Sequence, residues 1–230
     1  MAPNSTPPVA STRVQRGGER PAVVSPLGAH LRRERGRLGL SLRELARRLD
    51  VSPSLVSQVE TDKIQPSVGT LYAIVNELGL SFDEVFAAAE HAAKGEAAIE
   101  TGKPSQRLTG ADTGVGRVQR AADRSIIELE SGVIWERLTT WNDRDVDFIF
   151  ANYEVGGASS PEGKLVRHNG REFGIVISGR LGVTVGFEEN VLEAGDSISF
   201  ESSIPHRLHN DGDEVVTAIW VVVGRHHDPQ

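Results

Sequence analysis

The segment SLRELARRLDVSPSLVSQVETDKIQP, Ser41 to Pro66, predicts a helix, a tight turn and a second helix. Ser41 and Glu44 have the spacing of a capping box, in which the serine oxygen accepts the Glu44 amide proton and the glutamate bonds the serine amide. Ser52 is the expected N-cap of the second helix, and Pro53 suits its first position because proline lacks an amide proton. The first helix has an apolar face at helical spacing: Leu42, Leu45, Ala46 and Leu49.

The second helix has an outer face suited to reading DNA. Three apolar residues are predicted to face the first helix: Leu55, Val56 and Val59. The outer residues are small or polar: Ser54, Ser57 and Gln58. A short helix of this kind fits the DNA major groove, where Gln58 can bond both edge atoms of adenine. An ordinary helical hairpin packed in a core is the alternative.

The region from about Leu27 to Phe86 resembles a lambda-repressor-like (Cro-type) helix-turn-helix domain. The likeness is carried, in order, by Leu45-Ala46, Val51-Ser52, Val56-Ser57-x-Val59-Glu60, Pro66 and Leu71. The resemblance implies a five-helix DNA-binding domain. Gly39 and Gly79 are expected to end helices, and Ser81 begins the fifth with a second capping box.

Seven residues of this domain are predicted to contact DNA. The candidates for base edges are Ser54, Ser57 and Gln58, and the candidates for phosphate are Arg43, Ser52 and Lys63. Gln65 lies in the loop that runs along the DNA backbone in the family. The preceding helix adds a basic face, for which plain solvation is the alternative: Arg32, Arg33, Arg35 and Arg37.

Length and composition indicate an ordinary globular protein with two modest domains. The chain has 230 residues, of which 38% are hydrophobic and 25% charged. It contains no cysteine, which excludes disulfides and thiolate metal sites. Because no apolar run reaches the length of a membrane span and the N-terminus lacks the pattern of a secretory signal, we expect a cytoplasmic protein without a membrane partner.

The net charge of −7 is distributed unevenly along the chain. Residues 1–48 hold ten Arg and three Glu, whereas residues 91–230 hold 14 basic and 22 acidic residues. The basic end can therefore meet phosphate while the acidic end is repelled from it. An acidic solubilising surface with a disordered basic tail would give the same pattern.

Composition divides the chain into four parts. Residues 1–26 are rich in proline and predict a disordered tail, in which Arg13, Arg16 and Arg20 could contact the DNA backbone. Residues 27–88 are the helix-turn-helix domain. Residues 89–113 predict a helical tail that loosens into a linker. From residue 114 to 226 the helical spacing is replaced by short strands separated by turn residues, which predicts a sandwich or small barrel and a multidomain α + β chain.

Two motifs in the C-terminal part resemble the cupin family: His168-Asn-Gly-Arg-Glu172 with Gly179, and Gly195-Asp196 with Pro205-His206 and Asn210. The resemblance implies a cupin β-barrel, also called a double-stranded β-helix or jelly roll. The domain order, helix-turn-helix and then cupin, resembles a class of bacterial transcriptional regulators.

The cupin resemblance also implies a metal site made of His168, Glu172 and His206. Val166 stands where the family has a further histidine, so three of the four family ligands are present. Two imidazoles and one carboxylate suit a divalent Fe, Zn, Mn or Ni ion with open positions. The alternative is that His168 and Glu172 are polar residues at a pocket mouth and that His206 bonds a turn.

Local geometry leaves the pairing of the first motif open. A two-residue turn at Asn169-Gly170 would place His168 opposite Arg171. A three-residue loop would place His168 and Glu172 on one face.

A pocket in this domain could be lined by Trp135, Tyr153 and Trp220, with Arg167 and Arg171 near its rim. Aromatic residues on strands are, however, more often plain core. The aromatic residues are therefore not assigned to a site.

The sequence as a whole predicts a sequence-specific DNA-binding regulator, not an enzyme. Such readers use near-palindromic operators, so a homodimer is expected, with a small effector sensed by the cupin domain. The competing hypothesis is a cupin metalloenzyme, because hydroxypropylphosphonate epoxidase has the same three ligands behind a helix-turn-helix domain. That enzyme would be a non-haem Fe(II) oxidoreductase using His168, Glu172 and His206. A third hypothesis is a protein scaffold whose helical domain has lost DNA binding.

Overall fold

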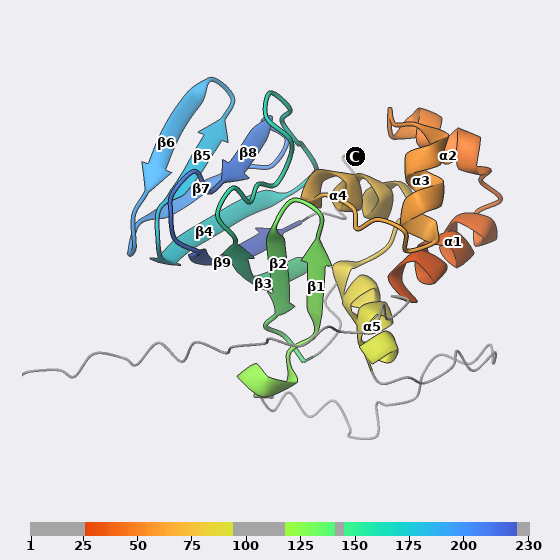
Figure 1. The fold of residues 1–230 in the computed structure, drawn as a ribbon, viewed down its shortest axis with the longest axis horizontal. Coiled ribbons are helices and arrows are strands. Elements are labelled where there is room, and N and C mark those ends of the chain that lie inside the picture. Colours follow the sequence, from red (N-terminus) through yellow and green to blue (C-terminus); the bar gives the residue numbers. More distant parts are fainter. Residues whose placement is uncertain (1–25, 94–117, 141–144, 225–230) are drawn as a thin grey trace, which may run out of the picture.

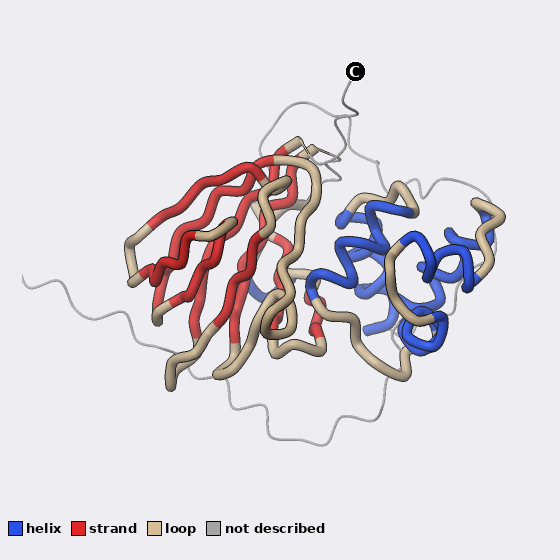
Figure 2. Tube along the Cα trace, turned by 90° about the horizontal axis from the view of Figure 1, so that it is seen from above, coloured by secondary structure: helices blue, strands red, loops and turns tan. Residues whose placement is uncertain are grey.

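The computed structural model describes residues 26–93, 118–140 and 145–224, which form a helical domain and a β domain side by side (Figure 1). Figure 2 shows the same division from above, with the helices on one side and the strands on the other. The predicted tail with Arg13, Arg16 and Arg20 lies outside the described residues, as do residues 94–113 of the predicted linker. Within the three described ranges, no helix is both long and apolar enough to cross a membrane.

The five predicted helices of the first domain are all present among the described residues. They are α1 (Pro26–Arg37), α2 (Leu42–Arg48), α3 (Pro53–Glu60), α4 (Val68–Glu77) and α5 (Phe82–Ala93). Ser52 and Ser67 cap α3 and α4 as N-cap residues, since each hydroxyl accepts the amide proton three residues later. Gly39 and Gly79, after α1 and α4, have positive φ angles of 67° and 65°, which glycine adopts without strain.

The two predicted capping boxes differ in the structure. At α5 the box is complete, because the Ser81 amide donates to Glu84 Oε2 (2.8 Å) and the Glu84 amide donates to Ser81 Oγ (3.2 Å). At α2 only the first half forms, with the Glu44 amide donating to Ser41 Oγ at 3.1 Å. The Glu44 carboxylate instead binds the guanidinium groups of Arg47 and Arg48 (2.7 and 2.8 Å). The prediction of a reciprocal box at α2 is therefore wrong, because two cations one turn away attract the carboxylate more strongly than one amide does.

The described β domain has nine strands in two antiparallel sheets. The larger sheet has the order β1 (Ile126–Leu129), β2 (Val133–Arg137), β3 (Val146–Tyr153), β9 (Val216–Val223), β4 (Arg171–Ser178), β7 (Ser197–Glu201). The smaller sheet has the order β6 (Glu188–Leu192), β5 (Leu181–Val185), β8 (His206–His209). The sequence pattern predicts seven of these strands. It misses β6 and β8, because β6 carries charged and mostly exposed residues and β8 is rich in histidine.

The core of the β domain lies between the inner faces of the two sheets. On β9 every second residue is buried: Val216, Ala218, Trp220 and Val222. From the smaller sheet, Leu181, Val183 and Leu208 are buried in the same core. This alternation is the pattern of strands with one face inward, and it places the pocket of the domain between the sheets.

The helical domain packs on the β domain through α4 and α5. An ion pair of 3.0 Å joins Arg137 Nη1 at the end of β2 to Asp83 Oδ1 in α5, and both side chains are largely buried. The Gly69 amide, in the first turn of α4, donates to the Ser159 carbonyl at 3.0 Å. Amides in the first turn of a helix have no partner within the helix, so the β domain supplies one across the domain boundary. The buried side chains of both domains form one continuous apolar cluster.

Candidate functional sites

The first site is the outer face of α3 in the helical domain. Val56 and Val59 are buried against the neighbouring helices, as their spacing predicts. Ser54 and Gln58 are exposed on the opposite side, and Ser57 is half-buried between the two faces. The helix therefore presents small and polar side chains to solvent on this face.

A buried ion pair fixes α3 on α1. Arg35 donates from Nε to Glu60 Oε1 (2.6 Å) and from Nη2 to Glu60 Oε2 (2.9 Å), which is a bidentate pair. Arg35 also donates to the Leu40 carbonyl at 2.6 Å. The Arg35 side chain is thus occupied inside the domain, so among the arginines of α1 it is structural. The exposed basic residues of this helix are Arg32, Arg33 and Arg37.

The other predicted DNA contacts lie on the surface around α3. Arg43, Lys63 and Gln65 are exposed, on α2 and in the loop that follows α3. Ser52 is exposed too, although its oxygen already accepts the Leu55 amide proton at 3.1 Å. Its hydroxyl proton is still available, so capping and phosphate contact are compatible roles.

The second site is a buried cluster of His168, Glu172 and His206 between the sheets. Glu172 Oε1 lies 3.0 Å from His168 Nε2 and 3.1 Å from His206 Nε2. One ligand atom from each of the three residues lies within 4.8 Å of the other two. The structure thus brings the three predicted ligand residues together at one point.

The chain between His168 and Glu172 crosses from one sheet to the other. Val166 pairs with His206 of β8 in the smaller sheet, whereas Arg171 begins β4 in the larger one. Gly170, with a φ of 107°, lies in the bend between them. Neither hairpin considered from the sequence forms, yet His168 and Glu172 face the same pocket.

Hydrogen bonds behind the cluster fix the orientation of each side chain. His168 Nδ1 lies 3.0 Å from the Asn169 carbonyl, and His206 Nδ1 lies 2.9 Å from the Ile204 carbonyl. A carbonyl only accepts, so Nδ1 carries a proton in both rings and Nε2 faces the pocket, with a lone pair in a neutral ring or as an N–H donor to Glu172 in a protonated ring. Trp220 Nε1 donates to Glu172 Oε2 at 2.6 Å, and Glu172 Oε1 is left buried without a well-formed hydrogen bond.

The charges in the cluster favour an ionised carboxylate. Burial raises the pKa of the Glu172 carboxyl, but the neighbouring imidazoles of His168 and His206 outweigh burial and hold the pKa far below its usual range. Burial alone would lower the pKa of His206. The hydrogen bond to the Glu172 carboxylate and its negative charge have the larger effect, so the pKa of His206 is raised above its ordinary value. A buried carboxylate beside two imidazoles is the charge pattern that a cation would complete.

The pocket around the cluster includes residues of both domains. Trp135, Tyr153 and Trp220 line it and are buried, as the sequence allowed. Arg167 is exposed, and Arg171 is exposed and pairs with Glu201 at 2.8 Å, so neither arginine lines this pocket. The two arginines are therefore not part of the pocket lining.

The lining residues that sequence reasoning missed include two from the helical domain, Val68 and Tyr72 of α4. The Tyr72 ring stacks on the His168 ring, with centroids 4.2 Å apart and planes within 2°. A sign was present in the sequence, since α4 is apolar on more than one side. Its buried residues are Val68, Leu71, Tyr72, Ile74 and Val75. A helix of this kind needs partners on two sides, and the β domain is the second partner.

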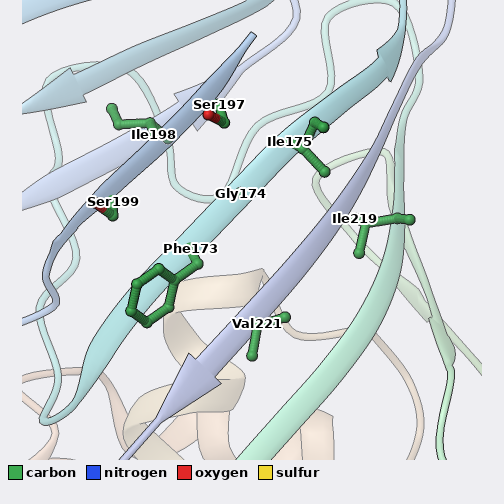
Figure 3. Close-up of a pocket in the computed structure, with 8 residues that line it drawn as sticks. All are labelled: Phe173, Gly174, Ile175, Ser197, Ile198, Ser199, Ile219 and Val221. Atoms are coloured by element: carbon green, nitrogen blue, oxygen red, sulfur yellow. The ribbon is translucent and has the colours of Figure 1, made fainter. Parts of the chain in front are cut away.

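A separate shallow pocket lies on the outer face of the larger sheet (Figure 3). It has a volume of about 370 Å³ and is lined by strands β4, β7 and β9. Its side chains are mostly apolar and include Phe173, Ile175, Ile219 and Val221. Phe173 is 42% exposed and Ile175 39%, which is unusual for large apolar residues on adjacent positions of a sheet face.

Comparison with known proteins agrees with both halves of the fold. The helix-turn-helix family model matches residues 31–85, and the cupin domain family model matches residues 149–222. The HTH-type transcriptional regulator PuuR of Escherichia coli is 27% identical over 185 residues, which cover 80% of this chain and 86% of PuuR.

One similar solved structure shows the same architecture along most of the chain. A helix-turn-helix family transcriptional regulator from Vibrio cholerae superposes with a TM-score of 0.59 at 18% identity, covering 90% of this chain and 97% of that one. Hydroxypropylphosphonic acid epoxidase from S. wedmorenis gives a TM-score of 0.42 at 19% identity, covering 87% of this chain and 98% of the enzyme. The second likeness is too low to bear on chemistry.

Proposed function

We propose that the chain is a helix-turn-helix transcriptional regulator with a C-terminal cupin domain, and that it binds a near-palindromic operator as a homodimer under the control of a ligand in the cupin pocket. The observation that carries this proposal is the pairing of an exposed polar reader face on α3 with a buried ligand cluster in the domain packed behind it. A ligand changes DNA affinity only through its difference in affinity between two arrangements of the protein.

The DNA contacts proposed are Ser54, Ser57 and Gln58 for base edges, and Arg43, Ser52, Lys63 and Gln65 for the backbone. Selection of bound fragments from random genomic DNA, followed by titration of the selected site, tests the reader. Gln58→Ala is expected to cost roughly 1–3 kcal/mol and to relax preference at one base pair. Lys63→Ala is expected to weaken all sequences about equally and to reduce the salt slope by about 1.

Lys164→Ala is the matched control, because Lys164 is exposed in the β domain and far along the chain from α3. No selected sequence at all would support the scaffold hypothesis instead. If Gln58→Ala leaves both affinity and preference unchanged, α3 does not read bases in the proposed way.

For the cupin pocket we propose a divalent ion held by His168, Glu172 and His206. The donor set fits, because the Nε2 atoms face inward, the carboxylate is held ionised, and Glu172 Oε1 has no other well-formed hydrogen bond. When bound, such an ion would supply a Lewis-acidic anchor for an oxygen or nitrogen atom of an effector. The side chains of Trp135 and Tyr153 would limit which effectors fit beside it.

Metal analysis of protein purified without chelator tests this site. We expect about one equivalent of Fe, Zn, Mn or Ni per chain in the wild type and a large loss in Glu172→Gln, with folding checked by circular dichroism. Metal content near zero after attempted reconstitution would remove the metal from the proposal. Turnover with Fe(II) and oxygen that Glu172→Ala abolishes would favour the enzyme hypothesis over a sensor.

The dimer proposed uses the outer face of β4, β7 and β9 as its interface, with a second copy of this chain as the occupant. A near-palindromic operator requires two reader helices related by two-fold symmetry, so the chain needs a self-complementary surface. The exposed apolar residues of this face supply one: Phe173, Ile175 and Ile177 of β4 with Val223 of β9. This face lies on the strands that also carry Glu172 and Trp220, so the interface adjoins the ligand cluster across a single sheet.

A further inference from the structure

The cupin pocket is closed on one side by the DNA-binding domain. Val68 and Tyr72 of α4 line the pocket together with the three ligand residues. Tyr72 is 6% exposed, and its ring covers the His168 ring face to face. Tyr72 also makes an edge contact with Phe82 of α5 (4.6 Å between centroids), so it lies between the pocket and the core of the helical domain. The wall that α4 supplies therefore belongs to the same helical domain as the reader helix α3.

The space enclosed by this wall is very small. The cavity between the lining side chains measures about 20 Å³. A cavity needs roughly 10–15 Å³ on the same measure to hold one water molecule, so this one has room for about one water or one ion. A metal ion fits with α4 in place. An organic effector of several atoms does not.

Backbone hydrogen bonds at and just before the start of α4 join it to the β domain, in addition to its ring contacts and apolar packing. The Gly69 amide donates to the Ser159 carbonyl, and the Glu130 amide donates to the Pro66 carbonyl at 3.2 Å. Gly69 also packs against Val166 so closely that a Cβ at this position would overlap Val166 Cγ1. Val166 occupies the position of the missing fourth metal ligand, so in this chain that position serves the domain contact. Interfaces between domains of one chain resemble transient interfaces, for which relative movement is expected.

We propose that α4 is a removable wall of the cupin pocket, and that an effector larger than a water molecule or an ion enters only when Val68 and Tyr72 withdraw. Docking of the DNA-binding domain and occupancy of the pocket by such an effector then exclude each other. This inference rests on the proposed function of the pocket as an effector site. It adds the route by which occupancy reaches the reader, since α4 cannot leave the pocket without moving the domain that contains α3.

A disulfide across the contact tests the proposal directly. An ideal Cβ at Gly69 lies 3.6 Å from Val166 Cβ, within the range of about 3.5–4.5 Å seen in disulfides. The natural chain has no cysteine, so Gly69→Cys with Val166→Cys is the only pair that can form. Oxidation locks α4 against the pocket, and reduction releases it in the same protein. Val166→Cys alone is the matched control, because it cannot form an intramolecular disulfide and it keeps Gly69, where a Cβ would overlap Val166 Cγ1.

Access to the pocket is measured with diethyl pyrocarbonate, a reagent larger than water that modifies neutral imidazoles. Chelator-treated protein is labelled in its oxidised and reduced forms, and the rate at each histidine is read by peptide mass spectrometry. We expect oxidation to slow labelling of His168 and His206 about tenfold or more, because it removes an open state that, as a minor conformation, is populated at roughly 0.1–10%. His209 is partly exposed on β8 and is not a pocket-lining residue, so its rate is expected to stay unchanged.

Equal labelling of His168 and His206 in the two forms, whether fast or slow, would overturn the proposal, and so would failure of the disulfide to form. Metal content and DNA binding are measured on the wild type in parallel. Absence of metal or of DNA binding in the wild type would contradict the proposed function. The labelling rates of chelator-treated protein test only whether α4 moves away from the pocket. The two failures are therefore distinguishable.

Discussion

At the scale of single residues, the orientation of His168, Glu172 and His206 depends on hydrogen bonds that these side chains make on the side away from the pocket. Trp220 bonds the Glu172 oxygen that does not face the histidines, and backbone carbonyls hold both Nδ1 atoms. Gly174 permits this arrangement, because the Trp220 ring lies where a Cβ on Gly174 would be. Such outer contacts orient ligands and tune their basicity.

Trp220→Phe tests the outer contact to Glu172. The substitution keeps an aromatic ring in the core but removes the Nε1 donor, so we expect metal affinity to fall by about 10–100-fold. Competition with a chromophoric chelator measures the affinity. Trp135→Phe is the matched control, since Trp135 lines the same pocket and its ring contacts are with Tyr72 and Phe82. Equal losses in the two variants would assign the effect to packing rather than to the hydrogen bond.

The raised pKa of His206 predicts a pH dependence of stability for the metal-free protein. Because Glu172 raises this pKa in the folded state above its ordinary value of 6.5, the protonated histidine stabilises the fold. That contribution is fully present below pH 6.5 and is lost as the pH rises through the raised folded value. The difference in Tm between the wild type and His206→Gln, followed by calorimetry, is therefore expected to shrink with rising pH. A difference that grows over this range would contradict the assignment.

At the scale of elements, the reader helix is held by contacts from outside itself. Ser52 caps its start, and the Arg35–Glu60 pair holds its last residue against α1. An eight-residue helix has little stability of its own, so its position depends on these contacts and on the burial of Val56 and Val59. Residues that never meet DNA thus determine where Gln58 lies.

Glu60→Ala is expected to destabilise the helical domain by roughly 3–5 kcal/mol, because it leaves the largely buried guanidinium of Arg35 without its partner. Urea unfolding followed by circular dichroism at 222 nm measures the loss. Glu77→Ala is the control, since it removes a partner of Arg48 in a pair that is substantially exposed and expected to contribute about 1 kcal/mol or less. Similar effects of the two substitutions would show that burial of the Arg35 pair does not matter.

Helix ends were the most predictable elements, because serine caps and glycine stops act within a few residues of sequence. Strands β6 and β8 were not predictable in the same way, since pairing with β5 rather than their own composition makes them strands. The ligand residues could be named from their motifs, but the crossing between sheets at Gly170 depends on Val166 pairing with β8. Tyr72 could not be placed in the pocket, because its spacing on α4 fits a helical core equally well.

At the scale of the whole molecule, the dimer interface proposed on the outer face of the larger sheet adjoins the pocket across a single sheet. Phe173→Asp places a charge on this face without touching the inner core. We expect the variant to be monomeric at micromolar concentration by analytical ultracentrifugation, with an unchanged circular dichroism spectrum. Its affinity for the selected operator is expected to fall, because each chain then binds one half-site alone.

Glu189→Lys, an exposed charge change on β6, is the control for Phe173→Asp. Its dimer is expected to stay intact, since β6 belongs to the other sheet. A Phe173→Asp variant that remains dimeric would place the interface elsewhere on the molecule.

The order β1-β2-β3-β9-β4-β7 has a consequence for a chain still being made on the ribosome. The five helices emerge early and can fold as a unit, whereas the larger sheet remains two separate halves until Val216–Val223 arrives between β3 and β4. The same late strand carries Trp220, which holds Glu172 in place. The helix-turn-helix domain therefore matures before the domain for which we propose a ligand response, and a nascent or truncated product lacking these eight residues would have a DNA-binding domain without the proposed control.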